Sequence, residues 1–477
     1  MSTTSLSIQR WAHESPFSCA LITPKQSYNW LQLHQSVVDC ASQLIAQGVR
    51  QHDVVTIIGK NQQDMVLMYL ACCHIGAIGA LTMPQPLALL QQKFERLYKR
   101  DAKPLVWLTD TVWQSFTDED QQTLRTRCTR FVINENRSDN GISVDGGNSV
   151  NTINIASSNI ASIIFTSGST GAPKAVAHSF AQHFASASGL LQEFDYGFGD
   201  TWLLSLPLYH VSGLAILYRW LSAGGCLKVG QGNLNLDIKD VTHASLVSTQ
   251  LSRLFEVKLP LTLTRVLLGG SHIPESLTAQ CAKLHIDAWL GYGMTEAAST
   301  VTAKRVNTSS TAGRVIPNRK LKIENQRIFV GGDTLAAGYF LQGNITPIID
   351  NDGWFDTKDL GCWENNELRV IGRVDNQFIS GGENIHCEQI EAELNRHPVV
   401  NQAFVVPVTD KEFGHRPVAM IDADILPSKI EMDVFLKERL EKFKWPVAYY
   451  LIPPELFASG IKVSRKELKR WLDIQLS

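Results

Sequence analysis

A run of small polar residues, Thr166 to Lys174, follows the apolar segment 163–165 and contains groups that can bind phosphate. Its sequence is Thr-Ser-Gly-Ser-Thr-Gly-Ala-Pro-Lys. A strand that ends in such a turn presents backbone N–H groups and hydroxyls to an anion, and Lys174 adds a positive charge. The stretch is not a Walker loop, in which Gly-Lys-Ser/Thr closes the turn. Its composition fits both a phosphate site and an ordinary surface turn.

Several later segments also combine glycine with residues capable of chemistry. Taken singly, each has an ordinary explanation: His210 fits a buried, hydrogen-bonded histidine, the Gly-Tyr-Gly at 291–293 a simple turn, and a C-terminal lysine a solvated helix position. In chain order the segments are PLYHVSG (207–213), LGGS (268–271), GYGMTE (291–296), DTKDLG (356–361), GRVD (372–375) and SGIKVSRKEL (459–468).

The elements that must position these segments follow an α/β rhythm. The spacing of apolar residues predicts helices over 27–48 and 64–75, with a buried strand at 54–58 between them. Gly48 is a suitable C-terminal stop for the first helix. The alternation predicts open α/β sheets joined by crossover helices. Further strands are expected near Ala77 and at 105–108, 131–133, 162–166, 202–205, 244–248 and 265–268.

The predicted alternation of helices and strands ends after about residue 310. Short strands at 327–330 and 368–370, separated by Gly and Asn turns, predict a small β subdomain. We therefore predict a large N-terminal α/β domain over 1–371 and a small, mobile α+β lid over 372–477, with the boundary near 371–376. Within the lid, helices are expected at 387–397, 431–442 and 464–475, and a strand at 402–408.

Composition limits the possible classes of function. The chain has 477 residues, 44% hydrophobic and 19% charged, with a formal net charge of −2. This balance predicts a globular protein of at least two domains, with no basic field for nucleic acid or an anionic membrane. Nine scattered cysteines without a CxxC pair favour reduced thiols in the cytoplasm over zinc or a disulfide framework. The N-terminus lacks a signal-peptide core, and no apolar run approaches the roughly 20 residues that span a bilayer. We expect small-molecule partners and leave homo-oligomerisation open.

The segments and their order resemble the acyl-adenylate-forming superfamily of acyl-CoA and aryl-CoA ligases, luciferases and peptide-synthetase adenylation domains. The resemblance extends over nearly the whole chain. It implies that the loop and Lys174 hold the outer phosphates of ATP, that Tyr292 stacks on adenine, and that Glu296 helps to hold Mg²⁺. Thr295 would meet the α-phosphate, and His210 would stand where the acyl pocket joins the thiol tunnel. The implied ATP-binding residues are Thr166, Ser167, Gly168, Ser169, Thr170, Gly171, Lys174, Gly269, Gly270, Ser271, Gly291, Tyr292, Gly293 and, beside the ribose, Asp359 and Arg373.

The resemblance also assigns roles within the C-terminal segment. Lys462 takes the place of the catalytic lysine, although the usual Gly-Lys pair is here Ile461-Lys462, which leaves Lys466 as an alternative. Asp375 is the implied hinge. Ser380, Gly381 and Gly382 would border the tunnel for the coenzyme A arm, unless they form only a turn between two strands.

The implied reaction has two steps. A carboxylate attacks the α-phosphate of ATP and expels pyrophosphate, and the resulting acyl-adenylate then transfers its acyl group to coenzyme A. Two anions meet in the first step, so Lys462, Mg²⁺ and donors from Thr295 and the loop would neutralise charge. Each preorganised donor typically contributes about 10²–10³ in rate. Rotation of the small domain would then withdraw the lysine and admit the thiol.

Within the superfamily, HVSGLAILYRW (210–220), SGGENI (380–385) and KEFGHRPVA (411–419) resemble the o-succinylbenzoate–CoA ligases of menaquinone synthesis. That acid has a second, benzoate carboxylate that stays ionised. Arg219 lies in an apolar segment, where a buried cation is costly without a partner. We therefore expect Arg219 to face this carboxylate, directly or through water, with a snorkelling or helix-capping arginine as the alternative. Ser212, Gly213 and Thr249 are further pocket candidates. The competing hypotheses are a CoA ligase for another aryl or medium-chain acid and a non-catalytic nucleotide-binding protein.

Overall fold

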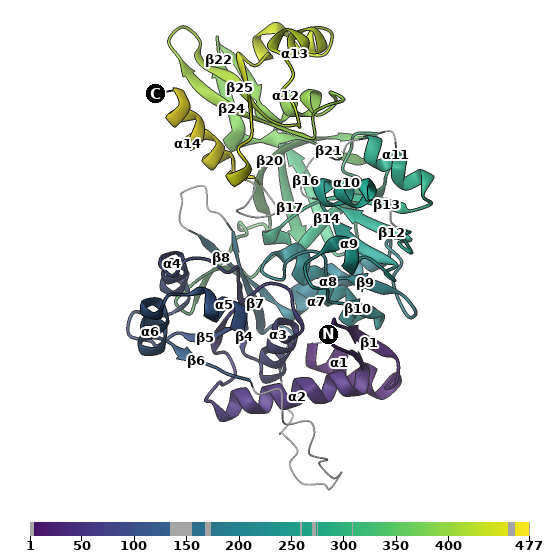
Figure 1. Ribbon diagram of the computed structural model, residues 1–477, viewed down its shortest axis with the longest axis vertical. Coiled ribbons are helices and arrows are strands. Elements are labelled where there is room, and N and C mark those ends of the chain that lie inside the picture. Colours follow the sequence, from purple (N-terminus) through teal and green to yellow (C-terminus); the bar gives the residue numbers. More distant parts are fainter. Residues whose placement is uncertain are drawn as a thin grey trace.

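The protein is described by a computed structural model that covers residues 4–133, 155–166, 173–257, 260–269, 273, 275–307, 309–456 and 463–476. Two large sheets with their helices form the lower part of the molecule in Figure 1, and a smaller sheet with its own helices stands above them. This mixed α/β architecture confirms the predicted fold class. Within the described ranges, no helix is long and apolar enough to cross a membrane.

The first large sheet contains the two strands that flank the phosphate-loop residues. Its order is β19 (Asn344–Thr346), β18 (Gly338–Leu341), β8 (Lys174–Ser179), β7 (Ile160–Thr166), β4 (Ile78–Thr82), β3 (Val54–Ile58), β5 (Leu105–Leu108) and β6 (Thr129–Arg130). Strands β7, β4, β3, β5 and β6 are parallel, as the crossover pattern predicted. β8 pairs antiparallel with β7, with Thr166 opposite Lys174, and its other edge pairs with β18.

The second large sheet carries most of the other predicted motifs. Its order is β15 (Arg314–Val315), β14 (Ser299–Arg305), β13 (Asp287–Met294), β12 (Arg265–Leu268), β11 (His243–Leu246), β9 (Thr201–Leu203), β10 (Cys226–Lys228), β1 (Cys19–Ile22) and β2 (Ser27–Asn29). The strands from β13 to β1 are parallel. The carboxyl ends of β12 and β13 therefore bring Gly269 and the segment 291–296 to the same edge.

The largest hydrophobic core fills the space between the two large sheets. It contains side chains from both sheets and from α2 (Trp30–Ala46), α3 (Gln63–Ile75), α7 (Phe180–Leu191) and α8 (Val211–Ala223). Separate cores cover the outer faces of the sheets. The outer helices are α4 (Leu87–Leu97), α5 (Asp110–Ser115) and α6 (Asp118–Arg127) on the first sheet, and α9 (Leu234–Asp237), α10 (Ser248–Glu256) and α11 (Glu275–Lys283) on the second. Helix α8, which contains Arg219, is thus an inner element.

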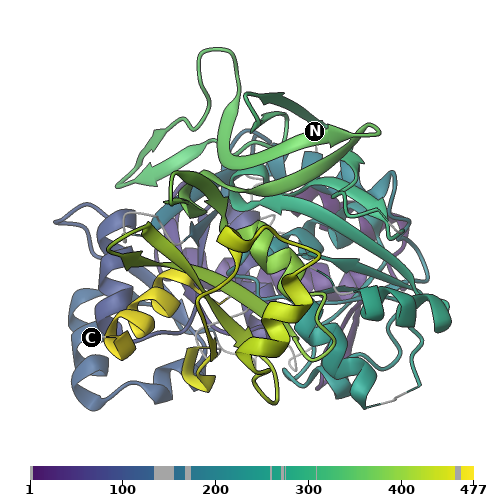
Figure 2. The same cartoon turned by 90° about the horizontal axis from the view of Figure 1, so that it is seen from above.

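The C-terminal third contains two further sheets, which are antiparallel except that β26 (Ala448–Leu451) pairs parallel with β25 (Gly414–Asp422). The first is β16 (Arg319–Glu324), β17 (Arg327–Gly332), β20 (Phe355–Glu364) and β21 (Glu367–Arg373), and the short helix η3 (Val374–Asn376) follows across the predicted boundary. The second contains β22 (Gln377–Ser380), β23 (Glu383–His386), β24 (Gln402–Asp410), β25 and β26, with helices α12 (Cys387–Leu394), α13 (Lys429–Leu436) and α14 (Arg465–Leu476). Seen from above, this second assembly overlies the large sheets (Figure 2).

Several predicted boundaries were wrong by a few residues. The helix predicted over 27–48 begins at Trp30, because Asn29 and Gln32 form a reciprocal capping box and residues 27–29 pair with β1. The helix predicted over 387–397 ends at Leu394, ahead of Pro398. The helix predicted over 431–442 spans Lys429–Leu436, with Ser428 as its N-cap. The strand expected at 131–133 is Thr129–Arg130.

Candidate active site

Three elements converge where the phosphate-loop strands end. Lys174 begins β8, and its Nζ lies 4.9 Å from the ring centroid of Tyr339 on the neighbouring strand β18. Tyr339 donates its hydroxyl hydrogen to Oε1 of Glu296 at 3.1 Å. Burial and the charge of Glu296 raise the pKa of Tyr339, so the phenol remains a donor. A lysine and a carboxylate, both predicted to serve ATP, therefore contact the same tyrosine.

A buried histidine ties the β8 strand to the segment 291–296. His178 donates from Nε2 to the backbone carbonyl of Thr295 at 2.8 Å. Because the acceptor is a carbonyl oxygen, Nε2 must carry the hydrogen. Burial lowers the pKa of His178 to about 4, so the ring is neutral at pH 7. This bond fixes Thr295 relative to the strand that begins at Lys174.

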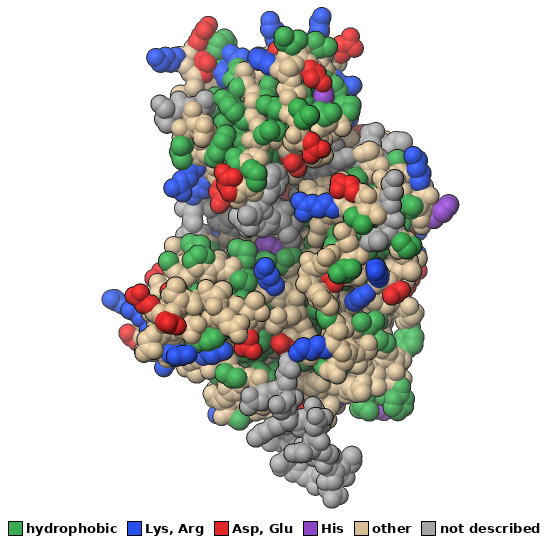
Figure 3. Space-filling view, viewed as in Figure 1, with side chains coloured by type: hydrophobic (Ala, Val, Ile, Leu, Met, Phe, Trp, Pro, Cys, Tyr) green, Lys and Arg blue, Asp and Glu red, His purple; other side chains and the backbone are tan. Residues whose placement is uncertain are grey.

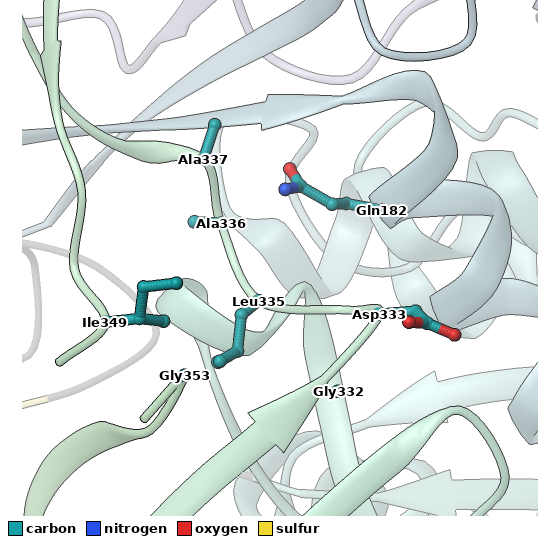
Figure 4. A pocket seen from close by; sticks show the side chains of 8 residues that line it. All are labelled: Gln182, Gly332, Asp333, Leu335, Ala336, Ala337, Ile349 and Gly353. Carbon is teal, nitrogen blue, oxygen red and sulfur yellow. The ribbon is translucent and has the colours of Figure 1, made fainter. Parts of the chain in front are cut away.

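A small pocket lies next to Ala336, which is hydrogen-bonded to Glu296 (Figure 4). Ala336 donates its N–H to the carbonyl oxygen of Glu296 at 2.8 Å. The pocket has a volume of about 270 Å³ and lies between α7 and the chain that follows β17, with Gln182 and Asp333 among its lining residues. None of the predicted site residues that the structure describes lines this pocket.

Tyr292, Asp359 and Arg373 form a hydrogen-bonded cluster. Tyr292 donates to Oδ2 of Asp359 at 2.6 Å, and Arg373 Nη1 donates to Oδ1 at 2.7 Å. Burial raises the pKa of Asp359, and the positive charge of Arg373 opposes that shift. Arg373 Nη2 also lies 3.7 Å from Asp375. Each carboxylate oxygen has a second lone pair, so Asp359 can still accept hydrogen bonds from hydroxyls of a ligand.

Helix α8 begins directly after His210, whose ring lies 4.9 Å from that of Tyr209. Gly213, in the first turn, packs against the chain at Pro207. A Cβ at this glycine would lie 2.1 Å from the Pro207 carbonyl oxygen, so the close approach requires glycine. Ser212 and Thr249 are half-buried, the former in the same turn and the latter at the start of α10.

Arg219 lies within α8 and is only 1% exposed. This burial excludes the snorkelling alternative. Nη2 donates to Oγ1 of Thr300 at 3.3 Å, and the guanidinium carbon lies 5.5 Å from the centroid of the Trp202 ring. Nε has no hydrogen-bond partner among the described residues. Thr300 lies opposite Gly293 in the β13–β14 pairing, so Arg219 contacts the strand that pairs with the segment 291–296.

A second buried arginine contacts the same threonine. Arg319 Nε donates to the carbonyl oxygen of Thr300 at 2.9 Å, and Nη2 donates to the carbonyl and hydroxyl oxygens of Ser186 at 2.9 and 2.8 Å. Nη1 donates to the Pro317 carbonyl at 2.7 Å. Burial lowers the pKa of both arginines to about 9, and the charge of Arg319 contributes to the shift at Arg219. In the part of the chain that the structure describes, neither arginine forms an ion pair with a carboxylate.

The C-terminal motif residues are held by a separate charged network. Arg465, at the start of α14, donates from Nη2 to Oε2 of Glu391 at 2.6 Å and to Oε1 of Glu388 at 3.3 Å. Glu388 also accepts a hydrogen bond from Asn376, the residue after Asp375. The chain three residues after Lys462 is therefore linked to the predicted hinge.

The residues predicted to border the coenzyme A tunnel form the turn of the β22–β23 hairpin. Gly381 and Gly382 have φ values of +59° and +89°, a conformation that favours glycine. Both are exposed, whereas Ser380 is buried. The geometry is thus that of a turn between two strands, with its glycine backbone open to solvent.

Part of the predicted site lies outside the described residues. Among the remaining members, Thr166 ends β7, and Gly269 follows β12 beside Gly291, with 4.0 Å between a Cβ built on Gly269 and the Gly291 carbonyl oxygen. The predicted residues that are not described are Ser167, Gly168, Ser169, Thr170, Gly171, Gly270, Ser271 and Lys462.

Three residues that contact this region were not predicted from the sequence: Tyr339, His178 and Arg319. The position of Tyr339 depends on β18 pairing with β8, which no spacing in the sequence reveals. The burial of His178 could have been predicted, because this residue follows the apolar residues 175–177 in a strand directly after the loop. Arg319 lies just beyond a Pro-Asn turn and looks like an ordinary strand residue.

Comparison with known proteins shows the family to which this protein belongs. The family model described as AMP-binding enzyme matches residues 8–340, more than half of the chain. The protein belongs to the AMP-binding enzyme family, as the ordered motifs predicted.

The similarity extends to particular ligases. The chain is 36% identical over 466 residues to the 2-succinylbenzoate–CoA ligase of Salmonella typhimurium, and the match covers 97% of each protein. An arginine-to-lysine variant of E. coli MenE with bound OSB-AMS has a TM-score of 0.86 and 35% identity, with 99% of each chain covered. The o-succinylbenzoate coenzyme A synthetase (MenE) of Bacillus subtilis, in complex with ATP and magnesium ion, has a TM-score of 0.82 and 28% identity, over 97% of this chain and 99% of that one.

Proposed function

We propose that this protein is an AMP-forming acid–thiol ligase that converts 2-succinylbenzoate to o-succinylbenzoyl-CoA, a step of menaquinone synthesis. The observation that carries the choice of acid is Arg219, a buried guanidinium with an unpartnered Nε and no carboxylate partner among the described residues. Near-full-length similarity to a 2-succinylbenzoate–CoA ligase supports the same choice.

The charge balance around Arg219 favours a dicarboxylic substrate. Reaction at the succinyl carboxylate leaves the benzoate carboxylate ionised, and Nε of Arg219 is available to donate to it. A guanidinium matches a carboxylate in both geometry and charge. A monocarboxylic acid would leave the cation buried without an anionic partner, which is costly. Ser212, Gly213 and Thr249 would line the same acid pocket.

Arg319 would support this selectivity without touching the acid. Its Nε, Nη1 and Nη2 already donate to protein oxygens, so the side chain is committed to holding Thr300 and α7. Its positive charge nevertheless acts on the same small volume, because Coulomb interactions are strong in a weakly screened interior. Two cations beside Thr300 would therefore attract an anion more strongly than Arg219 alone.

In the first step, an oxygen of the succinyl carboxylate attacks the α-phosphorus, and the bond to the β-phosphate oxygen breaks. Lys462 would neutralise the approaching negative charges, and Thr295, fixed by His178, would donate to the α-phosphate. Lys174 and the loop would hold the departing pyrophosphate. Tyr292 would contact adenine, with Asp359 and Arg373 beside the ribose.

The residues present fit a magnesium ion that accompanies ATP. Mg²⁺ usually binds one or two protein carboxylates together with phosphate oxygens and water. The described residues contain no cluster of three or more His, Cys, Asp or Glu side chains that could hold a metal alone. Glu296, oriented by Tyr339, would instead supply one carboxylate beside the ATP phosphates. Bound there, the ion would supply positive charge to the phosphates.

The second step requires coenzyme A beside the adenylate. Rotation of the domain 372–477 about Asp375 would withdraw Lys462 and bring the Ser380–Gly382 turn to the tunnel. The thiol then attacks the acyl carbon, and AMP leaves. His210, at the start of α8, would stand between the acid pocket and the thiol.

The partners of the protein would be small molecules in the cytoplasm. On the face shown in Figure 3, acidic and basic side chains are interspersed over both domains, which does not favour a polyanion there. The formal net charge of −2 agrees with this view.

Pyrophosphate release tests the proposal across acids. The panel contains 2-succinylbenzoate, its analogue 4-oxo-4-phenylbutanoate without the benzoate carboxylate, benzoate and a medium-chain fatty acid. We expect ATP-dependent release with the highest kcat/KM for 2-succinylbenzoate. A higher value for a monocarboxylic acid would favour a ligase for another acid, and no release with any acid would favour a non-catalytic nucleotide-binding protein.

A further inference from the structure

Two cysteines far apart in the sequence lie side by side in the second large sheet. Cys19 begins β1 and Cys226 begins β10, and these strands are parallel neighbours with Leu21 opposite Leu227. The two Sγ atoms are 3.3 Å apart. Cys19 is exposed, whereas Cys226 is only 7% exposed. An accessible thiol thus has a shielded thiol in contact with it.

The two thiols differ in acidity in the way that a nucleophile and a resolving thiol differ. The hydrogen bond from Cys226 stabilises the thiolate of Cys19 and lowers its pKa, whereas the same contact and burial raise the pKa of Cys226. Thiolates react with oxidants, and redox-sensitive cysteines are accessible, acidic and adjacent to a second thiol. Burial raises the pKa of five other cysteines, which makes them inert by comparison: Cys40, Cys72, Cys128, Cys281 and Cys387.

A disulfide between the two cysteines would require one of them to move toward the other. A disulfide requires the sulfur atoms to approach to about 2.05 Å. The backbone at Cys226 has little freedom to move, because the preceding Gly225 packs closely against Gly197. A Cβ at Gly225 would lie 2.6 Å from the Gly197 carbonyl oxygen. Cys19 is at the start of its strand, where the β1–β2 register is irregular between Cys19 and Leu21. The movement that closes the gap can therefore come from Cys19.

We propose that Cys19 and Cys226 form a reversible disulfide, with a hydroperoxide as the oxidant. The Cys19 thiolate attacks the peroxide, the O–O bond breaks, and Cys19 becomes a sulfenic acid while the peroxide is reduced to an alcohol, or to water for hydrogen peroxide. The Cys226 sulfur then attacks the sulfenic sulfur and releases water. In sum, two thiols and one hydroperoxide give one disulfide, one alcohol and one water. A small thiol in excess reverses the bond by exchange.

The disulfide would link β1, near the N-terminus, to β10, which follows α8, the helix that contains Arg219. Helices α1 (Thr4–Glu14) and α2 pack on α8: Trp11 Nε1 donates to the Leu221 carbonyl at 2.8 Å, and Trp30 stacks on Trp220 with ring centroids 5.1 Å apart. β1 belongs to the same N-terminal unit, so the bond constrains contacts that exist already. We expect oxidation to slow proteolysis at the N-terminus without lowering activity.

Peptide mapping of the full-length protein tests the pair. Reduced protein is treated with one equivalent of hydrogen peroxide, alkylated and digested without reductant. We expect a 19–226 linked peptide before any other cysteine reacts, two fewer alkylatable thiols, and recovery of both on adding dithiothreitol. Cys362→Ser, which changes a half-buried lone thiol, should leave the linkage unchanged. The proposal is overturned if another cysteine oxidises first, or if Cys19 proceeds to sulfinic acid with no linked peptide.

Two variants separate the roles of the thiols. In Cys226→Ser, Cys19 should accumulate as a sulfenic acid that dimedone labels. In Cys19→Ser, which alters an exposed side chain and should fold, dimedone should label neither position. Labelling of Cys226 in Cys19→Ser, at the rate seen for Cys19 in Cys226→Ser, would contradict the assignment of the nucleophile.

Discussion

Arg219 and Arg319 meet at Thr300, where Arg219 donates to the side-chain oxygen and Arg319 to the carbonyl oxygen of the same residue. Both guanidinium groups are buried, and among the described residues no carboxylate pairs with either. The two side chains differ in which hydrogen-bond donors remain without a partner among the described residues. Nε of Arg219 has no hydrogen-bond partner among the described residues, whereas every nitrogen of Arg319 donates to a protein oxygen. Arg219 therefore keeps a hydrogen-bond donor available, which the proposed function assigns to the acid.

Arg219→Gln should lower kcat/KM for 2-succinylbenzoate by about 10²-fold. Truncating one partner of a buried charge pair costs about 2–5 kcal/mol, and about 1.4 kcal/mol corresponds to tenfold. 4-Oxo-4-phenylbutanoate lacks the benzoate carboxylate, so its kcat/KM should change by less than about threefold. Steady-state kinetics with both acids measures the ratio. Equal losses for the two acids would show that Arg219 does not bind the benzoate carboxylate.

Arg319→Met should raise KM for 2-succinylbenzoate by about tenfold, because a charge that favours the acid is lost. Arg319→Lys retains the charge and should recover much of the preference for 2-succinylbenzoate over 4-oxo-4-phenylbutanoate. Ser186→Ala is the matched control, because it removes a hydroxyl that accepts from Arg319 without changing charge. It should lower Tm but preserve the preference. If the preference for 2-succinylbenzoate decreases in proportion to Tm across all three variants, Arg319 has only a structural role.

His178 should make stability depend on pH in the acidic range. Burial lowers its folded-state pKa to about 4, below the value of about 6.5 in an unfolded chain. Below pH 6.5 the unfolded chain binds a proton that the folded protein does not. The contribution of His178 to the free energy of unfolding is therefore complete above about pH 6.5. It decreases by about 1.4 kcal/mol per pH unit down to about pH 4.

His178→Gln removes this titration while keeping a donor for Thr295. Urea unfolding between pH 4.5 and 7 should show a shallower loss of stability in the variant than in the original protein. A residual slope is expected, because burial also lowers the pKa of the neighbouring His183. His13→Gln, which changes an exposed histidine, serves as the control. Identical slopes for His178→Gln and the original protein would contradict the buried, neutral state of His178.

Lys462→Ala should separate the two half-reactions. If this lysine neutralises charge only while the adenylate forms, pyrophosphate release should fall by about 10²–10³-fold. Thioester formation from supplied acyl-adenylate should remain close to that of the original protein. Lys466→Ala changes an exposed residue on α14 and is the matched control. A larger loss with Lys466→Ala would transfer the catalytic role to that residue.

The sequence predicted several strands well where the local pattern determines them. Strands β3, β5 and β12 lie at the predicted residues, because mostly apolar runs in a parallel sheet leave little ambiguity. Helix ends were less accurate, since they depend on caps such as Asn29 and Ser428, which compete with other polar residues nearby.

Contacts between distant segments were not predictable from spacing. Tyr339 reaches Glu296 because β18 pairs with β8. Arg319 reaches Thr300 because it follows closely after β15, which pairs with β14. Arg219 was selected because a buried cation needs a partner, and its burial is now established. The proposal that Arg219 binds the acid rests on charge balance and family resemblance, because the sequence motifs for ATP say nothing about the acid.

Mass spectrometry of the complete reaction tests the proposed activity most directly. The protein is incubated with ATP, Mg²⁺, coenzyme A and 2-succinylbenzoate, and the thioester, AMP and pyrophosphate are quantified together. We predict o-succinylbenzoyl-CoA in equal amount to AMP and pyrophosphate, with no thioester when ATP or coenzyme A is omitted. Absence of the thioester from folded protein, while another acid in the panel yields its CoA ester, would contradict the proposal.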